Sequence, residues 1–462
     1  MEISIFGAGK EVTGSCYGIS TATDNILVDC GMFQGSKDLE RMNYEDFNFD
    51  PSKYKALLLT HAHLDHSGRI PKLVRYGFKG KIYATDATKA LAFIIMMDSA
   101  KIAAQDTKEE NKRRAKEGLP ARKPLYNETD VQKAMKLFKE VTYDQEVEIT
   151  SNIKAKFYDA GHILGAASIQ VEVTEEKKKT TLAFSGDIGQ SEGIIVKDTE
   201  PIKKADYVFM ESTYGDRLHP PIGERQKELL RIIVETYAKK GKLMIPSFAV
   251  ERTQELLYCI GNFQQEALAP IINVYLDSPM AIKATAVFTK FPEYYNDEIR
   301  KSLKKRSNPF SFPKLINTEK MEDSRKINGE SSPCIIIAGN GMCSAGRIKQ
   351  HIKNNIEDPK NTLLFVGYQA EGTLGYWIKN GEKRVHLLGS EVSVNAKIES
   401  IEGFSAHADY KGLIKWVKNF SPAPKKVFIV HGEEKESLSL SKKLDKEGYK
   451  NYVPALGEKI TI

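Results

Sequence analysis

A short stretch of the chain concentrates metal-ligand side chains: three histidines and one aspartate occupy residues 61–66. The whole chain has nine histidines in 462 residues, so random placement explains this density poorly. Imidazole nitrogen and carboxylate oxygen bind zinc and, after zinc, manganese or iron. His61 and His63 are two residues apart, so on an extended segment they point the same way and can share an ion. Asp65 and His66 then face another side and can begin a second site. An apolar run comes directly before, which favours a metal site at a strand end over a histidine-rich surface loop.

Three further ligand-type residues, His162, Asp187 and His431, each follow a strand-like run and adjoin a glycine. Open sheets place their ligands beyond strand ends, and glycine lets the backbone approach a site closely. Counting ligands predicts two ions, with Asp187 bridging them through its two oxygens. The ion ligands are then His61, His63 and His162 for one ion, and Asp65, His66 and His431 for the other. Two ions about 3.5–4 Å apart activate a shared water and clamp the oxygens of a phosphoryl displacement.

The elements that must position these residues fall into two regions. The first ~200 residues are mainly strand-like, with predicted helices at 88–105 and 130–139. Their strands are predicted at 3–6, 16–19, 26–29, 154–157, 168–173 and 181–184. From about residue 209, strand-like and helix-like segments alternate, which predicts a mostly parallel sheet flanked by helices. Those strands are predicted at 207–210, 243–245, 271–276, 334–337 and 363–366, the helices at 223–239, 250–261, 280–290 and 344–355, and a loop-rich stretch at 291–330. The tail returns to a strand at 427–430 and a helix at 436–447.

Composition limits the class of protein. At 462 residues the chain is too long for one ordinary core, so it predicts two domains or one domain with a large insertion. It is 41% hydrophobic and 28% charged, as in ordinary globular proteins, and lacks the long apolar run that a membrane span needs. The N-terminus has no signal-peptide pattern, and five scattered cysteines without a CxxC pair predict a reducing, cytoplasmic setting.

The net charge of +7 is weak evidence for a nucleic-acid partner, but two local clusters are more basic. Residues 101–123 carry eight Lys/Arg against four Asp/Glu, and residues 300–306 form a second cluster. A solvated helix face is the simpler interpretation of either cluster taken alone.

The ligand pattern resembles that of the metallo-β-lactamase superfamily, through Asp29, His61-x-His63-x-Asp65-His66, His162 and Asp187. Further motifs resemble the β-CASP branch of nucleases in that superfamily. They are Glu211–Asp216, Phe404–Asp409, His431–Glu433, Pro246–Arg252, Asp277–Ala281 and Gly367–Thr373. The resemblance covers nearly the entire chain. It is to the short prokaryotic relatives of the pre-mRNA 3′-end cleavage endonuclease, which lack the N-terminal KH domains of longer archaeal relatives.

The resemblance implies an α/β protein: an αββα metallo-β-lactamase sandwich into which a parallel-sheet α/β β-CASP domain is inserted. The expected divisions are 1–208 and 396–462 for the sandwich and 209–395 for the insertion. It implies the same two groups of zinc ligands, with Asp187 bridging and Asp29 orienting a ligand or the metal water. Histidine at position 431 is the RNA-type pattern, since the DNA-processing branch typically has valine there.

The implied activity is that of a zinc-dependent ribonuclease hydrolysing single-stranded RNA by a two-metal hydroxide mechanism, in RNA processing or decay. His407 is the candidate general acid for the leaving oxygen, and Glu211 would orient it and hold it protonated. Asp187 and Asp65 would serve catalysis through the ions. The products would carry 3′-hydroxyl and 5′-phosphate ends. Endonucleolytic cleavage is favoured, and 5′→3′ exonuclease activity is compatible with the same site. Mn²⁺ or Fe²⁺ could replace zinc. A homodimer is compatible with the family.

A glycine-rich turn at 339–347 follows a strand and opens a helix, so its backbone N–H groups could bind a phosphate. A plain strand-to-helix turn is an equally good interpretation. If the turn binds RNA, Ser344 and Arg347 would hold the backbone, with Arg252 as a weaker candidate.

Two other functions are compatible with parts of the pattern. A hydrolase of small esters or lactams would explain the His/Asp cluster, but not the ~190-residue insertion or His407. An inactive RNA-binding scaffold would explain the overall pattern, but every ligand position is intact.

Overall fold

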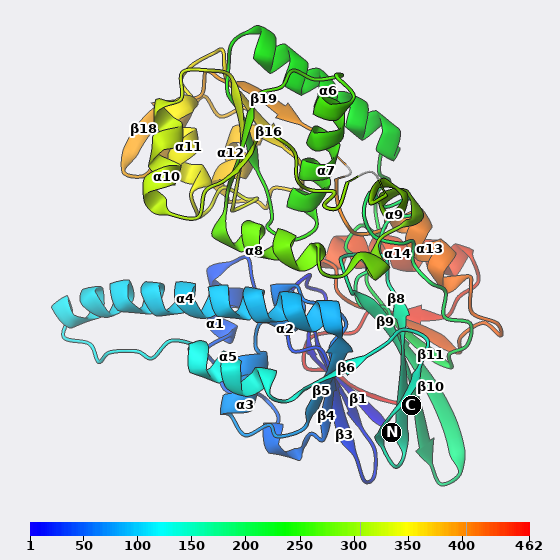
Figure 1. The fold of residues 1–462 in the computed structure, drawn as a ribbon. Helices are drawn as coiled ribbons and strands as arrows, with labels where there is room; N and C mark the ends of the chain where they lie inside the picture. Colours follow the sequence, from blue (N-terminus) through cyan, green and yellow to red (C-terminus); the bar gives the residue numbers. More distant parts are fainter. Residues whose placement is uncertain (305, 403) are drawn as a thin grey trace. The chain divides into compact units, whose positions relative to one another are not determined.

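The computed structural model describes residues 1–304, 306–402 and 404–462 (Figure 1), so Lys305 of the second basic cluster lies outside the described residues. The chain divides into two compact units. The first unit comprises 1–191, 198–218 and 407–462, and the inserted unit comprises 192–197 and 219–406. These junctions lie about ten residues after the expected 208 and 395. The reason at the first junction is that β11 (Tyr207–Met210) pairs with strands of the first unit on both sides.

The first unit contains two seven-stranded sheets. One has the order β22-β1-β2-β3-β4-β5-β6 and the other β21-β20-β11-β10-β9-β8-β7. The strands of the first sheet are β1 (Glu2–Gly7), β2 (Cys16–Ser20), β3 (Asn25–Val28), β4 (Ala56–Leu58), β5 (Lys81–Thr85), β6 (Phe138–Val141) and β22 (Lys459–Thr461). Those of the second are β7 (Glu146–Thr150), β8 (Ile153–Asp159), β9 (Ala167–Glu175), β10 (Lys178–Phe184), β11, β20 (Lys426–Ile429) and β21 (Asn451–Tyr452).

The main core of this unit lies between the two sheets, because their strands alternate apolar and polar side chains. In β8, Ile153, Ala155 and Phe157 are buried, while the side chains between them are not. Phe184, Phe209 and Phe428 stand side by side in register on β10, β11 and β20, with neighbouring ring centroids 4.7 and 4.8 Å apart.

Helices cover the outer faces, so the layers are αββα, as expected (Figure 1). On the first sheet's side are α1 (Lys37–Met42), α2 (Leu64–Ser67), α3 (Ile70–Arg75), α4 (Asp86–Lys116), α5 (Glu128–Met135) and the 3₁₀ turn Pro51–Lys53. On the other side, α13 (Tyr410–Val417) and α14 (Glu434–Lys446) pack against the second sheet through a second apolar cluster.

Two predicted helices have different ends in the structure. α4 begins at the N-cap Thr85 and continues to Lys116, well beyond the predicted end at 105. The predicted helix 130–139 ends at Met135, because residues 138–141 pair with β5 as strand β6. The apolar periodicity therefore located both helices but not their C-terminal ends.

The inserted unit is built on a six-stranded, all-parallel sheet with the order β14-β13-β15-β12-β16-β19. Its central strands are apolar on both faces, as expected for a parallel sheet covered by helices. The strands are β12 (Leu243–Pro246), β13 (Asn273–Asp277), β14 (Leu315–Asn317), β15 (Cys334–Ala338), β16 (Thr362–Phe365) and β19 (Lys397–Ser400). The helices are α6 (Ile222–Ala238), α7 (Arg252–Gln265), α8 (Pro279–Phe288), α9 (Asp297–Ser302), α10 (Met321–Lys326), α11 (Ile348–Asn355) and α12 (Leu374–Lys379). The unit also contains two 3₁₀ turns, Pro292–Tyr294 and Ile327–Gly329, and a hairpin formed by β17 (Arg384–Leu387) and β18 (Ser390–Ser393).

Among the described residues, no helix combines the length and apolar character that crossing a bilayer requires.

Candidate metal centre

The seven predicted ligands meet at one edge of the first unit, where strands of both sheets end. His61 and His63 follow β4, and Asp65 and His66 lie in α2 directly after them. The other three follow strands of the second sheet: His162 after β8, Asp187 after β10 and His431 after β20. They fall into the two predicted groups, and within each group the ligand atoms lie within 4.8 Å of one another. The groups are His61, His63, His162 and Asp187, and Asp65, His66 and His431.

The first group has the dimensions of a tetrahedral zinc site. His63 Nδ1 lies 3.2 Å from Nε2 of both His61 and His162. Asp187 Oδ2 lies 3.2 Å from His61 Nε2 and 3.4 Å from His162 Nε2. Tetrahedral zinc with bonds of about 2.0–2.1 Å separates its ligand atoms by about 3.3–3.4 Å, so the four atoms fit such an ion.

The second group shares Asp187 through its other oxygen. Asp187 Oδ1 lies 3.1 Å from His66 Nε2 and 3.4 Å from His431 Nε2, and His431 Nε2 lies 4.0 Å from Asp65 Oδ2. His66 Nε2, His431 Nε2 and Asp187 Oδ1 are all buried and converge on one point. Burying such polar atoms is costly, and a cation bound at that point would satisfy all three.

Burial sets the charge of these ligands. It lowers the pKa of His61 and His162 well below the usual value, and that of His431 to about 3, so these rings are neutral and can coordinate. Burial also raises the pKa of Asp65 to about 6. His66 differs: burial lowers its pKa, but the charges of Asp187 and Asp29 outweigh this and raise it well above the usual value. A cation bound there would displace that proton.

Hydrogen bonds behind the ligands fix their rings. Asp29 Oδ2 lies 2.8 Å from His66 Nδ1, and Asp29 also accepts from the backbone N–H and hydroxyl of Thr60. The Oγ of Ser15 lies 2.8 Å from His431 Nδ1. Each contact turns the other ring nitrogen toward the centre. Sequence reasoning missed Ser15 and Thr60; Thr60 borders the histidine cluster, but no local signal connects Ser15 with a residue 416 positions away.

Two glycines allow the close backbone packing at this edge. A Cβ at Gly31 would lie 1.5 Å from the carbonyl oxygen of Asp65, and a Cβ at Gly189 would lie 1.7 Å from that of Gly161. Any side chain at either position would therefore displace a ligand-bearing segment.

His407 and Glu211 form a pair beside the cluster. Glu211 follows β11, is fully buried, and places its carboxylate oxygens 3.0 and 3.2 Å from His407 Nδ1. The backbone N–H of Ile188 donates to Glu211 and fixes its carboxylate. His407 Nε2 faces the ligands, 3.8 Å from Asp187 Oδ2. Burial lowers the pKa of His407, but the charges of Glu211 and Asp187 and the hydrogen bond with Glu211 raise it to about 9. The ring is therefore protonated at neutral pH and can donate a proton from Nε2.

The three predicted phosphate-binding residues belong to the inserted unit. Ser344 is exposed, and its hydroxyl contacts Asn340. Arg347 donates to Asp277 Oδ1 at 2.7 Å and to the carbonyls of Thr318 and Glu319 at 2.7 and 2.6 Å. Arg252 lies 3.9 Å from Glu255. The guanidinium of Arg347 therefore ties three segments of this unit together.

Three family models match consecutive parts of the chain. The Metallo-beta-lactamase superfamily model matches residues 9–235, the Beta-Casp domain 253–378, and the Zn-dependent metallo-hydrolase RNA specificity domain 391–454. The model names agree with the order of the motifs along the sequence.

The chain is also similar to curated proteins along its whole length. It is 36% identical to a ribonuclease of Thermus thermophilus over 462 residues, which is all of both chains. It is 35% identical to an RNase J-like protein of Methanocaldococcus jannaschii over 443 residues, covering 95% of this chain and 94% of that one. A transcription termination factor FttA of the same archaeon is 33% identical over 452 residues, covering 96% of this chain and 68% of that protein.

Among solved structures, a protein of unknown function from Enterococcus faecalis superposes with a TM-score of 0.55 at 13% identity, covering 100% of this chain and 99% of that one. This likeness concerns the fold alone.

Proposed function

We propose that this chain, which belongs to the metallo-β-lactamase superfamily and to its β-CASP branch, is a zinc-dependent ribonuclease acting on single-stranded RNA. The observation that carries the proposal is the geometry of one edge: seven ligands in two groups, with the His407–Glu211 pair facing them. A matched model for an RNA specificity domain and relatives named as ribonucleases support RNA as the substrate.

The chain would hold two zinc ions through the two groups of ligands, with Asp187 contacting both. Bound there, the ions would supply a nucleophile by lowering the pKa of water and would neutralise charge on the phosphoryl oxygens. Asp29 and Ser15 keep the rings of His66 and His431 turned toward the centre, so that the ligands are already oriented. The convergence of buried nitrogen and oxygen atoms in the second group supports this assignment. Manganese or iron could bind the same nitrogen and oxygen donors, because these donors do not select zinc alone.

His407 would donate a proton from Nε2 to the leaving 3′ oxygen. Its Nδ1 is engaged by Glu211, so only Nε2 can serve, and the charge of Glu211 keeps the ring protonated. A proton delivered to that oxygen leaves a 3′-hydroxyl on one product and a 5′-phosphate on the other. We favour internal cleavage, with 5′→3′ exonucleolytic cleavage as a second mode of the same centre.

For RNA contacts away from the metals we propose Ser344, Arg347 and Arg252. Ser344 is an exposed residue of the glycine-rich turn. A phosphate that binds Arg347 would have to share its guanidinium with Asp277. We also propose a cytoplasmic setting, because all five cysteines are free and buried, as suits a reducing compartment. A homodimer is proposed from the family alone, and light scattering tests it.

Incubation of the zinc-loaded protein with labelled single-stranded RNA tests the function. Cleavage that EDTA abolishes, with products bearing 5′-phosphate ends, is expected. RNA with a 5′-phosphate and RNA with a blocked 5′ end distinguish the two modes, since only internal cleavage survives the block. Hydrolysis of a chromogenic ester or lactam without RNA cleavage would instead identify a small-substrate hydrolase. RNA binding with no cleavage would identify a scaffold.

A further inference from the structure

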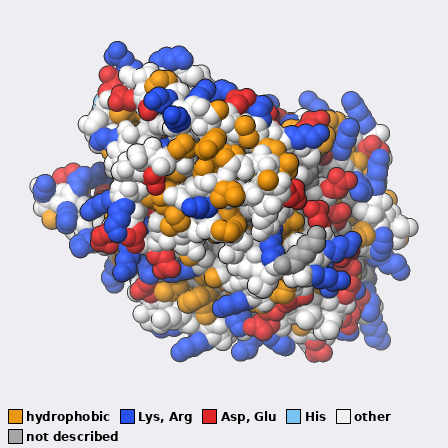
Figure 2. All heavy atoms as spheres, turned by 45° about the horizontal axis from the view of Figure 1, so that its top comes forward, with side chains coloured by type: hydrophobic (Ala, Val, Ile, Leu, Met, Phe, Trp, Pro, Cys, Tyr) orange, Lys and Arg blue, Asp and Glu red, His pale blue; other side chains and the backbone are white. Residues whose placement is uncertain are grey.

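Residues 101–124 form an arm that projects from the first unit. The last buried residue of α4 is Ala100, and the helix continues for sixteen residues to Lys116. Figure 1 shows this half of α4 extending beyond α5, with the following segment returning along it. Figure 2 shows the end of the arm at the left edge of the view, where Lys and Arg side chains cover much of the surface. Because none of residues 101–116 is fully buried, packing in the core does not explain this half of the helix.

Two lysines of the arm share one side of the helix with no acidic neighbour there. At about 100° per residue, positions 104, 108, 111, 112 and 115 share one face of the helix. Lys108 and Lys112 lie on that face, and none of the acidic residues of 101–116 does. Asp106 and Glu110 fall on the opposite face, where Glu110 is paired with Arg113 at 2.5 Å. The face that carries Lys108 and Lys112 is therefore positively charged.

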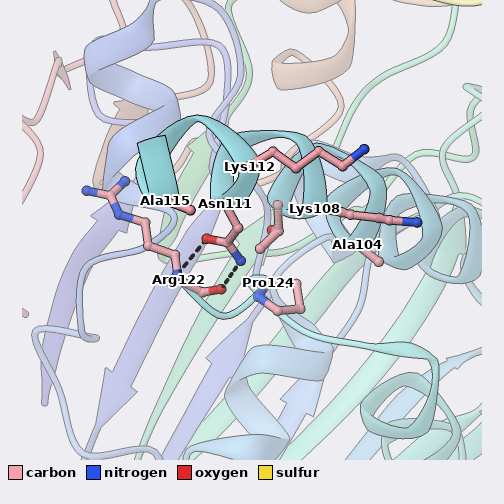
Figure 3. Close-up of a pocket in the computed structure, with 8 residues that line it drawn as sticks. Ala104, Lys108, Asn111, Lys112, Ala115, Arg122 and Pro124 are labelled. Atoms are coloured by element: carbon pink, nitrogen blue, oxygen red, sulfur yellow. Dashed lines mark hydrogen bonds between the residues drawn. The ribbon is translucent and has the colours of Figure 1, made fainter. Parts of the chain in front are cut away.

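The basic face lines a shallow groove of about 500 Å³ that is widely open to solvent (Figure 3). The returning segment forms the other side through Arg122 and Pro124. The lining residues are Ala104, Thr107, Lys108, Asn111, Lys112, Ala115, Arg122 and Pro124, with no carboxylate among them. Small side chains thus form the floor, and exposed cationic side chains the rim.

The groove is held open by a specific contact. Asn111 donates from Nδ2 to the Arg122 carbonyl at 2.9 Å and accepts from its backbone N–H at 2.8 Å. Both bonds use only the backbone of Arg122, so its guanidinium is left for other contacts. Figure 3 shows this pair of bonds between the helix and the returning segment. These two hydrogen bonds therefore fix the distance between the helix and the returning segment.

We infer that this groove binds the sugar–phosphate backbone of single-stranded RNA, at a site separate from the metal centre. The inference rests on the proposed function, because an anionic polymer is then the substrate of the same chain. Lys108 and Lys112 point to one side of the groove and Arg122 to the other, so positive charge extends along it (Figure 3). Charge spread in this way suits an extended phosphate backbone, which needs charge but no base-specific contact.

The arm is tied to the metal centre by α4 itself. Thr85 and Thr88 at the start of α4 both donate to the carbonyl of Gly165, three residues after His162. Lys108 lies twenty residues along the helix from Thr88, which is about 30 Å at about 1.5 Å per residue. A base-stacked strand, which advances about 3.4 Å per nucleotide, spans that distance with roughly nine nucleotides. Long RNA can therefore reach both places at once, and very short RNA cannot.

The test is the triple variant Lys108→Gln, Lys112→Gln, Arg122→Gln. All three side chains are exposed, and glutamine retains helix propensity, so the variant should fold. The matched control is Lys177→Gln, Lys178→Gln, Lys179→Gln, which removes the same charge from the exposed turn after β9 and from the exposed first two residues of β10. Affinity is measured on zinc-loaded protein with His407→Ala as background, so that the RNA stays intact. The probes are unstructured RNAs of 30 and 6 nucleotides.

For the 30-nucleotide RNA, the arm variant should lower the slope of log affinity against log salt by about two, since three phosphate contacts each contribute about 0.7. Between 50 and 200 mM salt the unaltered arm should then lose roughly 16-fold more affinity than the variant. The control variant should show no such change. Equal effects of the two triple variants, or no effect of the arm variant, would each overturn the inference.

Cleavage by the protein with His407 intact is read in parallel. The arm variant should lower kcat/KM for the 30-nucleotide RNA and leave that for the 6-nucleotide RNA unchanged. Binding to the groove without any cleavage by the unaltered enzyme would reject the proposed ribonuclease and leave the groove standing, so the two failures are distinct.

Discussion

Replacing Glu211 with glutamine tests the proton donor without altering its shape. Glutamine can still accept the N–H of Ile188 and hydrogen-bond His407, but it carries no charge. Burial lowers the pKa of His407, but the charges of Glu211 and Asp187 raise it to about 9, well above its usual value, so the site favours the charged ring. Zinc bound at Asp187 would cancel that carboxylate's share, which leaves Glu211, 3.0 Å away and fully buried, as the main source.

The sign of the effect follows from the role of His407. A general acid must be protonated, so activity falls as pH rises through its pKa. Loss of the Glu211 charge lowers that pKa. The alkaline limb of the kcat/KM profile should therefore move to lower pH by at least one unit, and each unit corresponds to about 1.4 kcal/mol of lost preference for the protonated ring.

The assay is RNA cleavage between pH 6 and 10 by zinc-loaded protein, with zinc content measured on each sample. Glu434→Gln is the control, since Glu434 is an exposed carboxylate paired with Lys10 at 2.7 Å. An alkaline limb that stays in place in Glu211→Gln, with zinc retained, would refute the assignment of His407 as the acid held protonated by Glu211.

His407→Ala should keep its zinc and lose about 10²–10⁴-fold in cleavage, and full activity would remove His407 from the chemistry. Asp187→Ala should lose zinc and activity together, measured by metal analysis, because its two oxygens face both groups; two ions retained would contradict the bridging role. Ser15→Ala should weaken zinc binding about 10–100-fold in a chelator competition, because His431 loses the partner that orients it. Asp277→Asn should destabilise the inserted unit by about 3–5 kcal/mol, measured by hydrogen exchange at β13 and β15, because it leaves the charge of Arg347 uncompensated. Burial raises the pKa of Asp277, but hydrogen bonds from His351, Ser324, Thr318 and Arg347 lower it to about 2, so this stabilisation is present above about pH 4 and is lost as pH falls toward 2.

The metal centre could be predicted because most of its signal is local. Four ligands lie within six residues, and the others follow apolar runs and adjoin glycine. The residues that orient the ligands carry no such signal. Ser15 follows a glycine just before β2 of the first sheet, and His431 follows β20 of the second, so only the packing of the two sheets brings them together.

Strand β11 shows the same limit for the fold. A run of four apolar residues at the start of an alternating region predicts a strand, but not the sheet that it joins. β11 lies parallel between β10 and β20, a strand more than two hundred residues later, so non-local pairing decides its place. The junction with the inserted unit therefore follows it rather than preceding it.

The end of α4 shows a limit of a different kind. Apolar periodicity stops near residue 105, because beyond Ala100 the helix has no core to face. The helix continues because Lys, Glu, Arg, Gln and Ala all favour helix and because Asn111 ties it to the returning segment. A helix with no buried face lacks the apolar periodicity by which its end could be located in the sequence.

The glycine-rich turn illustrates why a motif does not fix the role of each of its side chains. A turn of this kind before a helix predicts an anion site, and an arginine at its end is the natural partner of a phosphate. In the fold, Asp277, seventy positions earlier on β13, already holds that arginine at 2.7 Å. A phosphate approaching Arg347 must therefore compete with a buried carboxylate whose loss would itself destabilise the unit. Affinity for RNA at this turn should then depend more on the exposed Ser344 than on Arg347, and a Ser344→Ala variant that binds RNA unchanged would remove the turn from the RNA-binding surface.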